Sequence, residues 1–81
     1  MKVPELRKAL VEHGVHQRAV GIDGVDEGDN QYRLERSGAG CWITYYCERG
    51  NRAGLREFPN EERACEHFLQ MLLHDPSTQT R

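Results

Sequence analysis

The chain has 81 residues, enough for one domain around one modest hydrophobic core. Hydrophobic residues make up 37% and charged residues 30%, which favours a folded domain with a thin core, and so short a chain argues against a deep substrate pocket. The net charge is −2, so the chain lacks the excess of basic residues that is typical of strong nucleic-acid binders. No apolar run approaches the roughly 18 residues that cross a bilayer, and no signal peptide is visible, so we expect a cytoplasmic protein without a membrane partner.

The first third of the chain is predicted to hold a helix and a weak strand. Apolar residues recur at three- and four-residue spacing over residues 4–13, where Pro4 suits the first turn and Gly14 suits the C-terminal cap. Residues 15–22 are a weaker strand candidate. Residues 23–30 are rich in glycine and acids without any period, which indicates a loop.

The middle of the chain is predicted to form three consecutive strands. Residues 31–36 alternate polar and apolar side chains, and residues 41–48 are rich in aromatic and β-branched residues. The glycines of residues 37–40 indicate a turn between them. Gly50-Asn51 has glycine first, as in a two-residue type II′ turn, so residues 53–58 are predicted to return as the next strand.

A second helix is predicted after these strands. Asn60 is a natural N-cap, and the apolar stripe that follows should end near His74, before an Asp-Pro pair. The element order α-β-β-β-β-α predicts an α+β domain over residues 1–75, in which both helices pack on one face of an antiparallel sheet of three to four strands. Residues 76–81 are predicted to be a frayed tail.

The predicted turns also assign side chains to the two faces of the sheet. A symmetric turn at 37–40 places Leu34 opposite Ile43, and the two-residue turn places Ile43 opposite Phe58. One face then carries Tyr32, Leu34, Cys41, Ile43, Tyr45, Cys47 and Phe58. The other face carries Arg33, Glu35, Trp42, Thr44, Tyr46, Leu55 and Glu57. The first set is the more uniformly apolar, so we expect the helices to cover that face.

The second face is predicted to be a binding surface. Trp42, Tyr46 and Leu55 stand among charged residues there, and large aromatics in such surroundings often anchor a partner. Arg49 and Arg52 at the hairpin tip would add polar specificity. The alternative is that these aromatics merely cover neighbouring strands, or that a register slip of one residue exchanges the two faces.

The acidic loop is a second candidate contact. Its carboxylates lack the spacing of an EF-hand calcium loop, and they belong to Asp23, Asp26, Glu27 and Asp29. Either the loop is simply solvated, or it forms an acidic surface for a basic partner.

The cysteines and histidines do not form a recognisable catalytic or metal site. Cys41 and Cys47 are too far apart to share a metal, about 20 Å along an extended strand. Cys65 and His67 are two positions apart on a predicted helix and point in different directions. We therefore expect reduced thiols, no metal, no cofactor and no enzymatic activity.

Nucleic-acid binding is the alternative from another class. Arginines lie on or beside the predicted sheet among its aromatics, as in surfaces that stack bases, and they are Arg33, Arg36, Arg49, Arg52 and Arg56. Glu35, Glu48 and Glu57 lie among them, however, so we rank this alternative below a protein partner.

A resemblance extends from Tyr32 to Phe68. The segments "YRLER", "WITYYCERG" and "FPNEERACEHF" resemble small bacterial proteins that combine a Trp, a Tyr-Tyr pair and an E-R-G turn with an F-x-x-E-x-x-A-C-x-x-[FY] helix start. Those proteins are similar to immunity proteins encoded beside secreted polymorphic toxins, chiefly in actinobacteria. NAD-glycohydrolase toxins are among their neighbours.

The resemblance implies an immunity or antitoxin protein. Such a protein binds its cognate toxin in the cytoplasm of the producing cell and occludes the active site, which requires neither catalytic residues nor a cofactor. The alternatives are a nucleic-acid-binding regulator that uses the sheet face, a non-catalytic subunit of a larger complex, and a homodimer formed by sheet edges or faces.

Overall fold

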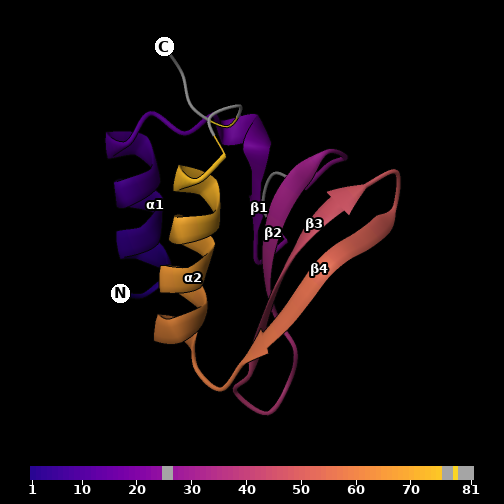
Figure 1. Ribbon diagram of the computed structural model, residues 1–81. Helices are drawn as coiled ribbons and strands as arrows, with labels where there is room; N and C mark the ends of the chain where they lie inside the picture. The colour runs from indigo at the N-terminus through magenta and orange to yellow at the C-terminus, as the bar shows by residue number, and fades with distance from the viewer. Residues whose placement is uncertain (25–26, 76–77, 79–81) are drawn as a thin grey trace.

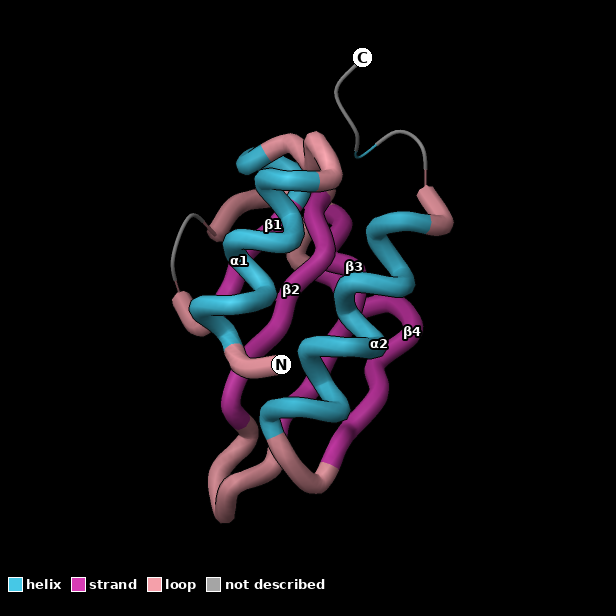
Figure 2. Tube along the Cα trace, turned by 90° about the vertical axis from the view of Figure 1, so that its left-hand side faces the viewer, coloured by secondary structure: helices cyan, strands magenta, loops and turns pink. Residues whose placement is uncertain are grey.

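The computed structural model describes residues 1–24, 27–75 and 78, and its elements follow the predicted order. Helix α1 (Val3–Glu12) and helix α2 (Glu61–Leu73) lie on the same face of the sheet (Figures 1 and 2). Among the described residues the sheet has four strands in the order β1 (Val20–Ile22), β2 (Gln31–Arg36), β3 (Trp42–Glu48) and β4 (Asn51–Phe58). The α+β class and the α-β-β-β-β-α order are therefore confirmed.

The sheet is mixed rather than wholly antiparallel. Strand β1 runs parallel to β2, with Val20 opposite Tyr32 and Ile22 opposite Leu34, and the remaining neighbours are antiparallel. A short 3-10 helix (Gln17–Ala19) takes the place of the first half of the predicted strand 15–22. As a result, β1 is a short edge strand whose two apolar side chains, Val20 and Ile22, both enter the core.

The β3–β4 hairpin closes one residue earlier than predicted. Glu48 pairs with Asn51, so the two central residues are Arg49 and Gly50. Both have positive φ, +52° and +79°, which defines a type I′ turn instead of the predicted type II′ turn. This turn matches the twist of antiparallel strands, and it lengthens β4 at its beginning.

The β2–β3 connection corrects the predicted register. Arg36 pairs with Trp42, which leaves residues 37–41 as a loop closed by hydrogen bonds of 2.9 Å from the Ser37 amide to the Cys41 carbonyl and from the Cys41 amide to the Gly38 carbonyl. The predicted turn at 37–40 was one residue shorter. Each β3 residue is therefore displaced by one position, and a displacement of one exchanges the two faces of the strand.

The core consequently lies on the side of β3 that was expected to be exposed. Trp42 is 5% exposed and packs with Leu34 and the helices, while Thr44 on the same side is fully buried. Helix α1 contributes Leu6 and Leu10. Helix α2 contributes its predicted stripe, in which Leu69 is partly buried and the other residues, Ala64, Cys65, Phe68 and Leu72, are buried. The expectation that Ile43, Tyr45 and Cys47 face the helices was wrong.

Two further contacts fix the ends of the helices. The Asn60 side chain accepts a hydrogen bond of 2.9 Å from the Arg63 amide, which confirms the predicted N-cap. Of the predicted tail, Thr78 alone is described; its hydroxyl donates to the Leu72 carbonyl at 2.9 Å, and its carbonyl accepts from the His16 amide. Thr78 is buried rather than frayed, and the other tail residues lie outside the described part of the chain.

Candidate binding face

The sheet face opposite the helices is the candidate site, and we call it the outer face. In Figures 1 and 2 both helices lie on the other side of the sheet, so neither covers it. The strand pairings and the alternation of side chains place on it Gln31, Arg33, Glu35, Ile43, Tyr45, Cys47, Arg52, Leu55 and Glu57. It therefore combines apolar side chains with charges of both signs.

The centre of the outer face is apolar but shielded. Ile43, Tyr45 and Cys47 form a buried cluster, with Tyr45 only 1% exposed, although no helix packs there. The Arg52 guanidinium lies 4.9 Å from the centroid of the Tyr45 ring, which is within the range of a cation–π contact. Long charged side chains can cover apolar surface in this way while their charged ends remain in water.

Leu55 is the exposed apolar residue of this face. Thr44 pairs with Arg56 and Tyr46 with Ala53, so Gly54 and Leu55 together face Tyr45 in a β-bulge. Gly54 has a φ of +65°, a conformation that favours glycine at such a bulge. The bulge therefore places Leu55, which is 48% exposed, beside the shielded cluster.

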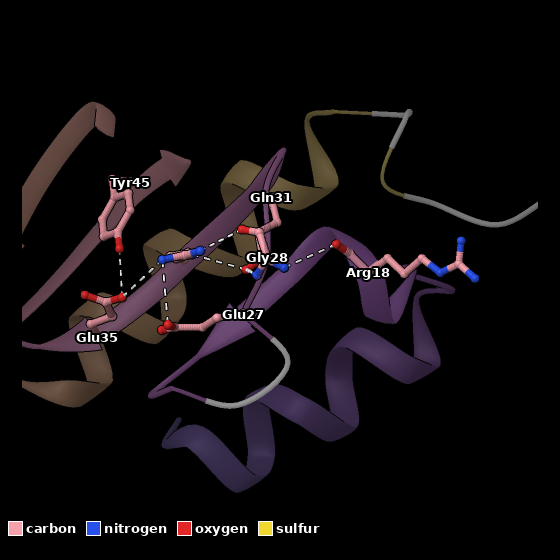
Figure 3. A network of polar contacts seen from close by, with 7 residues as sticks. Arg18, Glu27, Gly28, Gln31, Glu35 and Tyr45 are labelled. Atoms are coloured by element: carbon pink, nitrogen blue, oxygen red, sulfur yellow. Dashed lines mark hydrogen bonds and ion pairs between the residues drawn. The ribbon is translucent and has the colours of Figure 1, made fainter. Parts of the chain in front are cut away.

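Tyr45 is a neutral hydrogen-bond donor in this setting. Its hydroxyl donates to a Glu35 carboxylate oxygen at 2.7 Å (Figure 3). Burial raises the pKa of the Tyr45 phenol, and the hydrogen bond to Glu35 raises it further. The contact fixes the orientation of the Glu35 carboxylate on the surface of the face.

Arg33 joins the acidic loop to the outer face. Its side chain, 18% exposed, donates to the Gly28 carbonyl at 2.6 Å and to the Gln31 side-chain oxygen at 3.2 Å. The same guanidinium lies 3.7 Å from a Glu27 carboxylate oxygen and 4.0 Å from one of Glu35. Figure 3 shows Glu27, Gly28 and Gln31 converging at this point. Arg33 thus helps to hold the loop against the sheet.

Gln31 completes this network from the inside. It is 2% exposed; its side-chain oxygen accepts from the Gly28 amide at 2.7 Å, and its side-chain amide donates to the Arg18 carbonyl at 3.3 Å. Gly21 in β1 leaves room for it, since a Cβ at that position would overlap the Gln31 oxygen. A buried polar side chain with its hydrogen bonds made rigidifies its surroundings.

The residues predicted to contact a partner differ in their exposure. Trp42 is buried in the helix-side core, with the exposed Arg36 guanidinium 5.2 Å from its ring, so its predicted exposure was wrong. Tyr46 is partly buried on the same side and meets the Tyr32 ring edge-on at a centroid distance of 4.9 Å. Exposure is observed for Leu55, Arg49 and Arg52.

The acidic loop is partly neutralised by the protein's own arginines. Glu27 pairs with Arg33, and an Asp23 carboxylate oxygen lies 3.4 Å from the Arg36 guanidinium. Asp29 is exposed, and Asp26 lies outside the described residues. Asp23, Glu27 and Asp29 therefore remain at the surface, but two of the three carboxylates already have a cationic neighbour.

Sequence reasoning missed the residues that form the apolar centre. Ile43, Tyr45 and Cys47 were assigned to the helix side because the loop at 37–41 was predicted one residue too short. Gln31 was not singled out at all, although a glutamine that begins an alternating strand beside a glycine-rich loop could have indicated a loop-holding role. The correct loop length would have moved these three residues to the outer face, whereas the faces of the β4 residues depend also on the turn and on the bulge at Gly54 and Leu55.

A metal site, a reactive thiol and a membrane span are the other features to compare with the structure. No group of three or more His, Cys, Asp or Glu residues suited to a metal occurs in the described ranges. Burial raises the pKa of the Cys65 thiol to about 11, and the nearby Glu61 carboxylate also raises it. No helix in the part of the chain that the structure describes is long and apolar enough to cross a membrane.

A second apolar surface lies on the opposite side of the molecule. A groove of about 350 Å³ runs between α1 and β1, lined by residues such as Leu10, Val15 and Ile22. Val11, which is 77% exposed, stands at its rim. This groove lacks the dense charge pairing of the outer face. Val11 therefore provides a position for matched control variants.

Comparisons with protein-family models, with curated proteins and with solved structures found no match for this chain. The site is therefore defined by its geometry. Its three components are the shielded apolar centre, the exposed Leu55 and the charged hairpin tip.

Proposed function

We propose that this chain is an immunity-type binding protein that neutralises a partner toxin by direct occlusion. The outer face and the tip of the β3–β4 hairpin form the contact surface. The observation that carries the proposal is the exposure of Leu55 beside a shielded apolar cluster, surrounded by charged side chains of both signs.

The composition of the outer face is typical of a protein–protein interface. Such interfaces have an apolar centre, an arginine-rich polar rim and few anchors that supply most of the binding energy. Leu55 takes the place of Trp42 as the apolar anchor, since Trp42 lies in the core. Movement of the Arg52 side chain away from the Tyr45 ring would expose further apolar surface to a partner.

The hairpin tip adds a projecting contact. In Figure 1 the turn between β3 and β4 extends away from both helices. Arg49 occupies this turn with a φ of +52°, a left-handed conformation that glycine and asparagine adopt more easily than arginine. A residue that conflicts with its local backbone preference is often retained for function, so Arg49 is assigned to partner recognition.

The resemblance to immunity proteins supports the class of partner. Occlusion requires a rigid surface, and the Arg33 network supplies one by holding the acidic loop against the sheet. The proposed partner is the cognate toxin of the producing cell, with an NAD-glycohydrolase toxin as the first candidate, and the proposed location is the cytoplasm. No cofactor takes part.

Inhibition of a candidate toxin tests the proposal. The product of the gene beside this chain's own is purified, and its hydrolysis of NAD is measured as the chain is titrated into the assay. We expect stoichiometric inhibition, and we expect Leu55→Glu and Arg49→Asn each to weaken it by at least about tenfold, because each removes a contact worth roughly 1.4 kcal/mol or more. The matched control, Val11→Glu, places the same charge on the α1 surface and should inhibit like the wild type.

The variants separate recognition from stability. Arg49→Asn improves the turn, so weaker inhibition by a better-folded variant would identify a recognition residue. Absence of inhibition by the wild type, or equal effects of Leu55→Glu and Val11→Glu, would contradict the proposal. The nucleic-acid alternative ranks lower because Trp42 and Tyr45 are buried and offer no stacking platform on the outer face.

A further inference from the structure

Strand β4 presents a free edge. It is the last strand in the order β1-β2-β3-β4, and within the described residues it pairs with β3 alone. Seven of its eight residues are exposed, and Figure 2 shows it at the side of the sheet. An unpaired edge of this length displays backbone donors and acceptors that can pair with another strand.

The β-bulge lies at the centre of this edge. Gly54 and Leu55 together occupy one position of the sheet, opposite Tyr45. The regular pairs on either side involve three residues each, Asn51–Ala53 on one side and Arg56–Phe58 on the other. With Gly54 and Leu55 counted as one position, β4 therefore has the same number of paired residues on each side of its bulge.

The charges on the outer-face side of β4 are antisymmetric about the same centre. Arg52 lies two positions to one side of the bulge and Glu57 two positions to the other, since their partners are Cys47 and Ile43 of β3. Leu55 lies at the centre and is 48% exposed. If β4 is rotated by 180° about the bulge, Glu57 therefore takes the position of Arg52, and Arg52 takes the position of Glu57.

We propose that the β4 edge binds the β4 edge of a second copy of this chain, antiparallel and with the two-fold axis at the bulge. Arg52 of each copy then lies opposite Glu57 of the other, and the two Leu55 side chains meet at the axis. Residues 51–53 of one copy pair with 56–58 of the other, on both sides. Opposite charges in facing positions stabilise such a pair, and like charges destabilise it.

The bulge limits the strength of this contact without preventing it. A bulge interrupts regular pairing, but here the two interruptions coincide at the axis, so the regular segments on both sides remain able to pair. Six residue pairs should bury less than the roughly 1,200 Å² at the lower end of standard interfaces, so we expect weak association with a dissociation constant on the order of 0.1 mM. The dimer would join two sheets edge to edge, and the inference does not depend on the proposed function.

Charge reversal tests the pairing. Association is measured by sedimentation equilibrium from about 10 μM to about 1 mM, a range that brackets the expected constant. Arg52→Glu and Glu57→Arg should each weaken association at least about tenfold, because each places two like-charged pairs at the interface. The double variant should restore association, because opposite charges again face each other. An equimolar mixture of the two single variants should also associate, since a mixed dimer pairs two Glu residues of one copy with two Arg residues of the other.

Matched controls carry the same charge changes elsewhere. Arg63→Glu and Glu66→Arg both change exposed residues of α2, away from β4, so each should associate within about twofold of the wild type. Circular dichroism confirms that every variant is folded. A wild type that stays monomeric at about 1 mM would overturn the proposal and leave the edge to a strand of another protein. Reversals no stronger than the controls, or a mixture that fails to associate, would also overturn it.

Discussion

Trp42 shows at the scale of one residue that position in the strand decides the role of an aromatic. Its side chain lies among core residues of both helices, and Arg36, its cross-strand neighbour, approaches the ring at 5.2 Å. The charges around it in the sequence suggested a binding anchor, yet the ring is 5% exposed. We expect Trp42 to act through stability rather than through contact with a partner.

Truncation of Trp42 should destabilise the fold strongly. Trp42→Ala is expected to lower the free energy of unfolding by about 3–5 kcal/mol, because it removes a buried aromatic and leaves a cavity. Trp42→Phe, which retains an aromatic ring, should lower it by about 1–3 kcal/mol. Urea denaturation followed by circular dichroism measures both values. A loss below about 1 kcal/mol for Trp42→Ala would contradict the buried position.

The β3–β4 hairpin shows at the scale of an element how local geometry and function can disagree. Its type I′ turn requires positive φ at Arg49 and Gly50, and asparagine followed by glycine is the preferred pair for such turns. The chain has arginine at the first of these positions instead. The hairpin therefore forms with a residue that its backbone does not favour.

Replacing this arginine should stabilise the hairpin. Arg49→Asn is expected to raise the free energy of unfolding by about 0.5–1 kcal/mol, because asparagine adopts positive φ at lower energy. Arg49→Val should lower it, since β-branched residues resist that conformation. Thermal and urea unfolding of the two variants, side by side with the wild type, measures the difference. Equal stability of the asparagine and valine variants would show that the turn is not of type I′.

At the scale of the whole molecule, polar contacts connect segments that are distant in sequence. The Val3 amide donates to a Glu61 carboxylate oxygen at 2.8 Å, which joins the starts of the two helices. The Tyr32 hydroxyl donates to an Asp75 carboxylate oxygen at 2.9 Å, which joins β2 to the end of α2. A thin core is thereby supplemented by hydrogen bonds between its layers.

His67 makes the stability of the molecule depend on pH. The ring packs against Phe58 at a centroid distance of 5.0 Å; burial lowers its pKa below 6.5, and the Arg56 guanidinium lowers it further. Since the unfolded chain then binds the proton more readily, the contribution of His67 to stability is present above pH 6.5 and is lost as the pH falls through its folded pKa.

Substitution of His67 should flatten this dependence. The free energy of unfolding of the wild type is expected to fall more between about pH 7 and pH 5 than that of His67→Gln, which cannot take up the proton. Urea denaturation at several pH values gives the two curves, and their difference cancels the titration of the carboxylates they share. Parallel curves would contradict a lowered pKa at this histidine.

The sequence predicted the elements of this fold much better than its faces. Helix stripes, the Asn60 cap and the alternation in residues 31–36 are local signals, and all three agree with the structure. The face of Trp42 and the exposure of Leu55 beside Tyr45 depend on the length of one loop and on one bulge. Such features are settled by packing across strands, which leaves little trace in any short window of sequence.

The loop at 37–41 also imposes a rule of parity on the chain. An insertion or deletion of one residue that was taken up by the strand pairing would shift β3 against β2 by one place and turn Trp42 outward, whereas a shift of two would keep every side chain on its present face. A change of one residue in the length of this loop should therefore be absorbed within the loop or by a compensating bulge, because either keeps Trp42 in the core. A single glycine added to the strand pairing would invert β3 even though every core residue stayed the same.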